Sequence, residues 1–141
     1  MAYDIQCKLP SEWISEVETY EDESGSVITH LAASHPDGSF VEVYAGPMPE
    51  GETPEDQAFA NYAETVGFND DDPEDFNPII KFKFSGKSAW GFDALCDDNS
   101  SMRFLSQQVR GGLLAIIVFG AADDSAVAAL HNLLERTLRI K

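Results

Sequence analysis

The first 80 residues of this chain almost lack positive charge. They hold 19 acidic residues and one base, Lys8, whereas residues 81–141 hold 6 acids and 8 bases, and the net charge is −16. A surface this negative repels nucleic-acid phosphates and anionic lipid, which argues against nucleic-acid and membrane-surface functions. Two interpretations stay open: a solvated surface that favours solubility, or a patch that attracts a basic protein partner.

Long hydrophobic runs are also missing. The longest, residues 113–119 (LLAIIVF), has the length of a strand and falls well short of the ~20 residues of a membrane helix. The first ten residues, MAYDIQCKLP, contain neither a basic segment nor an apolar core, so no signal peptide is visible and a cytoplasmic location is the default. A length of 141 residues with 43% hydrophobic content predicts a single globular domain over residues 1–141.

Cysteine and histidine are scarce and scattered. Cys7 and Cys96 belong to no metal-binding or redox spacing, so we expect two buried, reduced thiols, with a disulfide or a reactive thiol as the alternatives. The three histidines form no HExxH motif, and no GxSxG motif is present. His131 lies on an apolar helical stripe and is expected to be a hydrogen-bonded histidine at the core edge. These observations predict no catalytic residue, no metal and no cofactor.

One tripeptide, Gly86-Lys87-Ser88, matches the end of a phosphate-binding P-loop. That motif requires a further glycine five residues before Gly86, where this chain has Lys81, and a helix afterwards. The residues that follow, SAWGFDALC, alternate as a strand does, so a hairpin turn is the better interpretation.

The length of that turn decides which face the aromatic side chains occupy. A two-residue loop would place Trp90 opposite Lys83, and a three-residue loop would place it opposite Phe82. We favour the three-residue loop, because it gathers the aromatic residues Phe82, Phe84, Trp90 and Phe92 on one face.

The acidic segment 69–75 (NDDDPED) raises the question of a calcium site. Counted from Asp70, an EF-hand requires glycine at position six and glutamate at position twelve, where this chain has Asp75 and Lys81. A solvated loop is therefore expected here.

Hydrophobic periodicity predicts an α+β fold, with an antiparallel sheet of about six to seven strands packed with two main helices. Strands are expected at 3–9, 26–33, 40–46, 79–85, 88–96, 101–109 and 113–119. The last of these is apolar throughout and should be central in the sheet, whereas 101–109 is expected at an edge, with Arg103 and Arg110 outward. Residues 16–26 are expected to form a loop or a frayed strand.

Two helices carry clear start and stop signals. Thr53 caps a helix over 54–66 that ends at Gly67, with Phe59, Tyr62, Ala63 and Val66 as its apolar stripe. A second helix begins at Asp123 and Asp124, and its stripe consists of Val127, Leu130, His131, Leu134 and Leu138. Trp13 and Ile14 are expected to cover the edge of the core.

This order of elements, which opens with Leu9-Pro10-Ser11-Glu12-Trp13 and includes a helix begun by Thr53-Pro54, resembles the PsbP-like fold. That fold is shared by the photosystem oxygen-evolving subunit, the Ran-GTPase nucleotide-release factor and small bacterial domains of unknown function. The resemblance covers the whole chain as architecture and carries over no functional residue. It implies a protein-binding or scaffolding role; one similar branch, the Eag-type chaperones of type VI secretion, holds apolar effector helices.

We therefore expect a non-enzymatic binding module, an adaptor or a chaperone, whose partner is a basic protein or an apolar helix. The alternative is a small-ligand-binding protein or an enzyme with its site in an aromatic-lined cleft. A monomer and a homodimer are both compatible with the sequence. The candidate ligand or partner surface consists of Trp13, Tyr62, Trp90, Asp70, Asp71 and Asp72.

Overall fold

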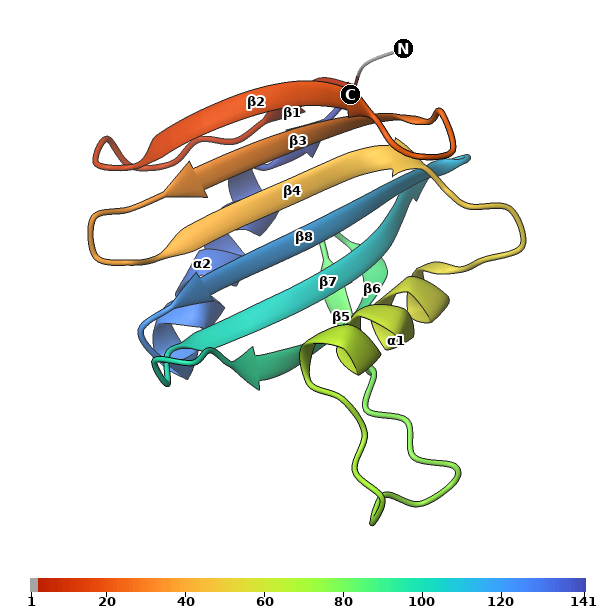
Figure 1. The fold of residues 1–141 in the computed structure, drawn as a ribbon. Coiled ribbons are helices and arrows are strands. Elements are labelled where there is room, and N and C mark those ends of the chain that lie inside the picture. Colours follow the sequence, from red (N-terminus) through yellow and green to blue (C-terminus); the bar gives the residue numbers. More distant parts are fainter. Residues whose placement is uncertain (1–2) are drawn as a thin grey trace.

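A computed structural model describes residues 3–141 as a seven-stranded antiparallel sheet with one helix on each face (Figure 1). The strand order is β2-β3-β4-β8-β7-β6-β5, and β1 and β9 form a separate pair. The elements are β1 (Ile5–Gln6), β2 (Ile14–Glu21), β3 (Val27–Ser34), β4 (Phe40–Pro47), α1 (Pro54–Thr65), β5 (Ile80–Phe84), β6 (Lys87–Leu95), β7 (Ser101–Arg110), β8 (Leu113–Ala121), α2 (Asp124–Thr137) and β9 (Arg139–Ile140). The predicted α+β class is confirmed. Met1 and Ala2 lie outside the described residues. They are part of the predicted domain over residues 1–141 and of the first ten residues that were inspected for a signal peptide.

The main core lies between α2 and one face of the sheet. The predicted stripe of α2 is confirmed, since Val127, Leu130, His131 and Leu134 of the helix and Leu138 after it are buried. Opposite them, the sheet contributes Val41, Val43, Leu105, Ile117 and Phe119. Asp123 caps the helix by accepting a hydrogen bond from the Ala126 N–H at 2.8 Å. Each large apolar side chain buried here stabilises the fold by about 1.5–3 kcal/mol.

A smaller core lies under α1 on the other face. Thr53 and Asp56 form a capping box at the start of α1, and Gly67 follows its end at a φ of 83°, as predicted. Of the predicted apolar stripe, Tyr62 packs against this core, but the rest is wrong: Phe59 is 41% and Val66 50% exposed, and Ala63 is exposed as well. The helix instead turns the small Ala58 to the sheet, because a methyl group lets its backbone approach the bulky rings of β6 and β7.

Residues 16–26, expected as a loop or frayed strand, mostly belong to a full edge strand. All eight residues of β2 pair with β3, from Ile14 opposite Ser34 to Glu21 opposite Val27. Every side chain of β2 is exposed, so Ile14, at 70%, does not cover the core, whereas Trp13 packs partly buried against it. The charges that concealed this strand in the sequence are those that protect an edge from pairing with another chain.

The predicted strand 3–9 is reduced to two residues. β1 pairs only with β9, with Ile5 opposite Ile140. The alternation nevertheless holds, since Tyr3, Cys7 and Leu9 also turn partly buried side chains to the main core.

The register of the β5–β6 hairpin differs from both expected registers. The loop has two residues rather than the favoured three, and it begins earlier in the chain than the expected two-residue loop. Phe84 pairs with Lys87, so the loop consists of Ser85 and Gly86, and Trp90 lies opposite Lys81. Both loop residues have positive φ, 54° and 81°, the conformation of the tight turns that match strand twist. The Ser85 N–H donates to Glu135 Oε2 at 2.9 Å, which holds this non-glycine residue in place.

The predicted gathering of four aromatic residues on one face is therefore wrong. Phe82 and Phe84 pack against the α2 core, and Trp90 and Phe92 belong to the α1 core.

β7 is an interior strand between β6 and β8, not an edge. Arg103 is paired rather than solvated: its Nε and Nη2 donate to the two carboxylate oxygens of Asp93 at 2.7 and 3.1 Å. Its guanidinium lies 4.7 Å from the ring centre of Phe82, and Nη1 donates to His131 Nδ1 at 3.2 Å. The hydrogen-bonded His131 predicted at the core edge is thereby confirmed. An arginine is tolerated inside the sheet because its donors have partners.

Gly91 permits the close approach of β6 to β7. A Cβ atom at Gly91 would lie 1.7 Å from the carbonyl oxygen of Phe104, a backbone atom that cannot move aside. We expect Gly91→Ala to lower the free energy of unfolding by about 3 kcal/mol or more, measured by urea denaturation. Gly112→Ala is the matched control, because a Cβ there meets nothing within 4 Å. Equal urea midpoints for the two variants would contradict the packing described here.

In three hairpin turns an aspartate carboxylate accepts hydrogen bonds from the turn, which makes the stability of the fold depend on pH in the acid range. The carboxylate accepts a backbone N–H bond from the serine two residues later, in the pairs Asp22 with Ser24, Asp37 with Ser39 and Asp98 with Ser100. Bonds from the serine hydroxyl or backbone hold the pKa of each carboxyl below its ordinary value. A lowered pKa in the folded state stabilises the fold above the unfolded pKa of about 3.9, and the effect is lost as pH falls through the folded pKa.

The triple substitution D22N/D37N/D98N keeps an oxygen acceptor in each turn and removes the titration. We expect the wild type to exceed this variant in stability above about pH 4.5 and the difference to shrink towards pH 2, measured by urea denaturation across this range. The triple D70N/D71N/D72N controls for the loss of three negative charges. A difference that does not depend on pH would show that the turns do not cause it.

Candidate functional site

The aromatic residues of the predicted surface do not meet in one cleft. Trp13 lies on the α2 side of the sheet, with its ring centre 5.5 Å from that of His35. Tyr62 and Trp90 pack on the opposite side, in the α1 core, where Tyr62 meets the ring of Phe92 edge-on at 5.2 Å. Tyr62 and Trp90 are therefore brought together, and Trp13 is separated from them by the sheet.

Exposed aromatic side chains gather where α1 ends. The ring centre of Phe68 lies 5.2 Å from that of Phe59, 5.3 Å from Tyr62 and 6.2 Å from Phe76. Phe59, Phe68 and Phe76 are 41, 42 and 36% exposed, and Val66 lies two helical turns after Phe59. We call Phe59, Val66, Phe68 and Phe76 the phenylalanine patch. Sequence reasoning missed it because Phe59 and Val66 fit a core-facing stripe.

The acidic loop continues directly from this patch. Asp70, Asp71 and Asp72 lie in a turn in which Asp72 Oδ2 accepts from the Asn69 N–H at 2.7 Å, and Phe76 closes the next turn onto the Pro73 carbonyl oxygen. Asp70 and Asp71 are exposed and Asp72 is half-buried. Within residues 3–141, no three carboxylate, histidine or cysteine side chains converge as metal ligands. The loop therefore adds negative charge to the edge of the phenylalanine patch.

A second acidic surface is the part of the sheet that α1 leaves uncovered. In Figure 1, α1 crosses the β5–β7 end, and β2, β3 and β4 lie open on the same side. At its centre, His30 lies between two carboxylates, with Nδ1 3.4 Å from Glu18 Oε1 and Nε2 3.5 Å from Glu42 Oε1. Its ring stacks on Tyr44 at 4.2 Å. Sequence reasoning gave His30 no special role, since only strand pairing brings these groups together.

The environment of Tyr44 reports the electrostatic character of this open surface. Burial, followed by the negative charge of Glu42 and other acidic groups, raises the pKa of the phenol above its ordinary value. Ile28 and Phe40 lie over Gly46 and Gly120, where a Cβ atom would come within 2.5 Å of their side chains. The open surface is acidic, and it is hollowed between Ile14, Phe40 and Glu42.

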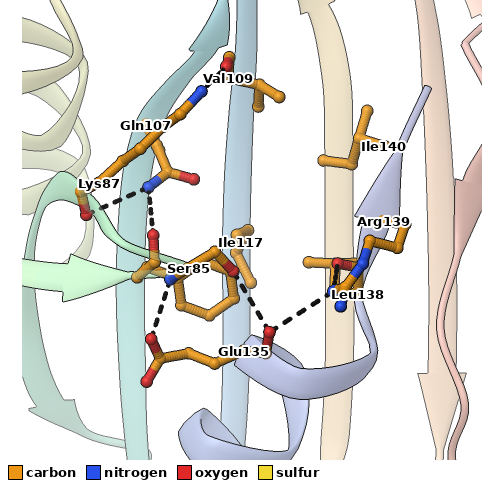
Figure 2. Close-up of a pocket in the computed structure, with 10 residues that line it drawn as sticks. Ser85, Lys87, Gln107, Val109, Ile117, Glu135, Leu138, Arg139 and Ile140 are labelled. Atoms are coloured by element: carbon orange, nitrogen blue, oxygen red, sulfur yellow. Dashed lines mark hydrogen bonds between the residues drawn. The ribbon is translucent and has the colours of Figure 1, made fainter.

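A pocket of about 420 Å³ opens at the end of α2 (Figure 2). The turn at Ser85, strands β7 and β8, the last turn of α2 and strand β9 surround it. Its apolar lining consists of Phe84, Val109, Ile117, Leu138 and Ile140, and its polar lining of Ser85, Lys87, Gln107, Glu135 and Arg139. Sequence reasoning missed this pocket because its walls come from distant segments, with Phe84 and Ile140 at 56 residues apart.

The two cysteines are free, as expected, and both are half-buried rather than buried. Cys7 Sγ lies 3.5 Å from the Thr137 hydroxyl, and burial raises the pKa of its thiol. A raised pKa lowers the thiolate fraction, so Cys7 is poorly suited to act as a nucleophile.

Comparisons with protein-family models, with curated proteins and with solved structures found no match. The PsbP-like resemblance therefore stays a prediction. No helix within residues 3–141 is long and apolar enough to span a membrane.

Proposed function

We propose that this protein is a non-enzymatic binding module that holds a basic amphipathic helix of a partner protein on the phenylalanine patch and the acidic loop. The observation that carries the proposal is the cluster of exposed aromatic rings at the end of α1, with the run of carboxylates lying between Phe68 and Phe76 in the chain. The sequence predicts a partner that is either a basic protein or an apolar helix. A basic amphipathic helix has both the positive charge of the first and the apolar face of the second. The PsbP-like resemblance points to the same class of function, without supplying a site.

The apolar part of the surface supplies binding energy. Phe59 and Phe68 each leave about two fifths of their surface in water, at 41 and 42%. Burial of apolar surface yields about 25 cal/mol per Å², and rigid aromatic side chains lose little entropy on binding. A protein that keeps several such rings together in water gains by covering them.

The acidic part supplies orientation and attraction. Residues 70–75 contain five acids, and no lysine or arginine occurs between Lys8 and Lys81. Lysine or arginine side chains beside the apolar stripe of a partner would face these carboxylates. Such contacts raise the association rate and weaken with salt, since exposed charges are screened over about 10 Å at 0.1 M.

The spacing of the rings favours a helix as the partner. Ring centres in the patch are 5.2 and 6.2 Å apart. Side chains three and four residues apart on a helix are spaced by about 5–6 Å, so they match this row. A second copy of this chain fits poorly, because two acidic loops would then face each other.

An aromatic-lined enzyme cleft has less support. Trp90 lines a pocket of about 420 Å³ at the start of α1, but Tyr62 does not line it and packs against Ala58, Phe92 and Phe104 instead. Trp13 belongs to the other side of the sheet.

The test replaces two exposed apolar residues of the patch. F59Q/V66Q keeps good helix formers on the surface of α1 and removes its two outward apolar side chains. V17Q is the matched control, because Val17 is 54% exposed on β2, outside the patch. Wild type, variant and control are immobilised in parallel and used to capture proteins from the native cell extract. The captured proteins are quantified by mass spectrometry, and one is then purified for titration.

We expect wild type and V17Q to retain a basic protein that binds F59Q/V66Q at least about 10-fold more weakly, as for the loss of interface anchors. D70N/D71N/D72N should make binding less dependent on salt concentration. E16Q/E18Q/E42Q, which removes the same number of charges from the open surface, is the control and should leave the salt dependence unchanged. The proposal is wrong if wild type retains no such protein, or if the purified partner binds F59Q/V66Q as tightly as V17Q.

A further inference from the structure

The pocket at the end of α2 contains a buried amide whose oxygen lacks a partner. Gln107 is 5% exposed and points inward from interior strand β7. Its Nε2 donates to the Phe84 carbonyl oxygen at 2.9 Å and lies 3.5 Å from the carbonyl oxygens of Lys87 and Ser88. These three acceptors fix the orientation of the amide, so Oε1 must face the other way.

Figure 2 shows Oε1 of Gln107 turned into the pocket. None of the hydrogen bonds formed among residues 3–141 is accepted by this oxygen. The buried polar atoms that lack a partner in the described residues are His30 Nε2 and Ser106 Oγ, so Gln107 Oε1 is reached by water in the pocket. A ligand that displaces this water loses affinity unless it brings a hydrogen-bond donor of its own.

The rest of the lining is apolar on the inside and positively charged at the rim. Phe84, Ile117 and Leu138 give an apolar interior to a volume of about 420 Å³, within the range of about 300–1,000 Å³ that small-molecule sites occupy. Figure 2 shows Lys87 on one side of the pocket and Arg139 on the other. The interior thus suits a compact apolar group and the rim suits an anion.

The two rim cations keep their positive charge without a carboxylate partner. Lys87 Nζ donates to the Val109 carbonyl oxygen, and Arg139 Nη1 donates to that of Leu138 at 2.7 Å. Neither cation forms an ion pair within the part of the chain that the structure describes. The same holds for most bases of residues 3–141, where Arg103 is the one lysine or arginine in an ion pair, and it leaves both cations able to meet an anion.

Glu135 is the one carboxylate in the lining, and it is engaged at the turn. Its Oε2 accepts from the Ser85 N–H at 2.9 Å, and its Oε1 lies 3.4 Å from His131 Nε2. Its charge therefore lies between the β5–β6 turn and α2, away from the two rim cations.

We propose that this pocket binds a small apolar carboxylic acid that carries an N–H or O–H group. The apolar body lies against Phe84, Ile117 and Leu138, the donor group meets Gln107 Oε1, and the carboxylate meets Lys87 at the rim. This site is separate from the phenylalanine patch, so it stands whether or not a protein binds there.

Three matched probes test each part of this assignment. Indole-3-acetate has an aromatic body, an N–H donor and a carboxylate; 1-methylindole-3-acetate lacks the donor, and indole-3-acetamide lacks the charge. Each is titrated into the full-length protein labelled with ¹⁵N, and backbone amide shifts give the Kd and the location. We expect saturable shifts at Ser85, Gln107 and Ile140 with indole-3-acetate. The methylated probe and the amide should each bind about 10-fold more weakly, as for the loss of one hydrogen bond or one charge contact.

Two substitutions separate the pocket from general attraction. Lys87→Gln should raise the Kd of indole-3-acetate about 10-fold and leave the Kd of indole-3-acetamide unchanged. Lys81→Gln, which removes the same charge beside Trp90 on the α1 side of the sheet, is the control and should change neither. These positions are exposed, so folding does not depend on them.

Several results would overturn the assignment. One is the absence of saturable shifts up to millimolar probe, which would leave water as the occupant. Others are equal Kd values for the three probes, or shifts centred on β2–β4. Because none of these measurements involves Phe59 or Asp70, failure here is distinguishable from failure of the proposed protein-binding function.

Discussion

The structure depends on β8, a strand that must be covered on both faces. Residues 113–121 (LLAIIVFGA) are almost entirely apolar, so the odd-numbered side chains need a core on one face and the even-numbered ones need cover on the other. α2 meets the first requirement through a continuous stripe. α1 is shorter and shifted towards β6 and β7, so it meets the second only in part.

The surfaces proposed for binding arise from this incomplete cover. Since α1 uses Ala58 and Tyr62 to approach the sheet, Phe59 and Val66 turn away from it and join Phe68 outside. On the opposite face, the main core thins where α2 ends, and the helix no longer fills the space beside β7. The pocket that contains Gln107 lies there. The two features follow from the lengths and positions of two helices on one sheet.

Local signals in the sequence predict most of the elements. Thr53 and Pro54 marked the start of α1, and the apolar run at 113–119 indicated a central strand. Each of these signals acts within a few residues, where turn and capping chemistry operates. The face that a helix presents is different, since Ala58 and Phe59 compete for the sheet and the outcome depends on the rings of β6 and β7.

The register of the β5–β6 hairpin escaped prediction for a similar reason. Ser85 adopts positive φ with support from Glu135, which lies 50 residues later in the chain. Arg103 was predicted on an edge strand because its partners are distant in the sequence. Asp93, Phe82 and His131 contact it only after β6, β5 and α2 have come together. The same limit applies to the candidate sites: Gln107 gave a local hint as a polar residue at an inward position, but the cations at the rim of its pocket come from β6 and β9.

The acidic residues include two groups that differ in what their carboxylates contact. Some have backbone partners: Asp22, Asp37 and Asp98 bind turn N–H groups, and Asp56 and Asp123 cap helices. These are accounted for by folding, whatever the protein binds. Asp70 and Asp71 are exposed beside the phenylalanine patch, and Glu16 and Glu18 are exposed on the open surface.

Solubility alone would be served by carboxylates spread over the whole surface, because net charge acts without regard to position. Here the second group of carboxylates lies next to exposed rings in one place and surrounds a stacked histidine–tyrosine pair in another. Charge beside apolar surface is the arrangement that a basic, amphipathic partner complements. The location of these acids, more than their number, is therefore what favours the binding interpretation over the solubility interpretation.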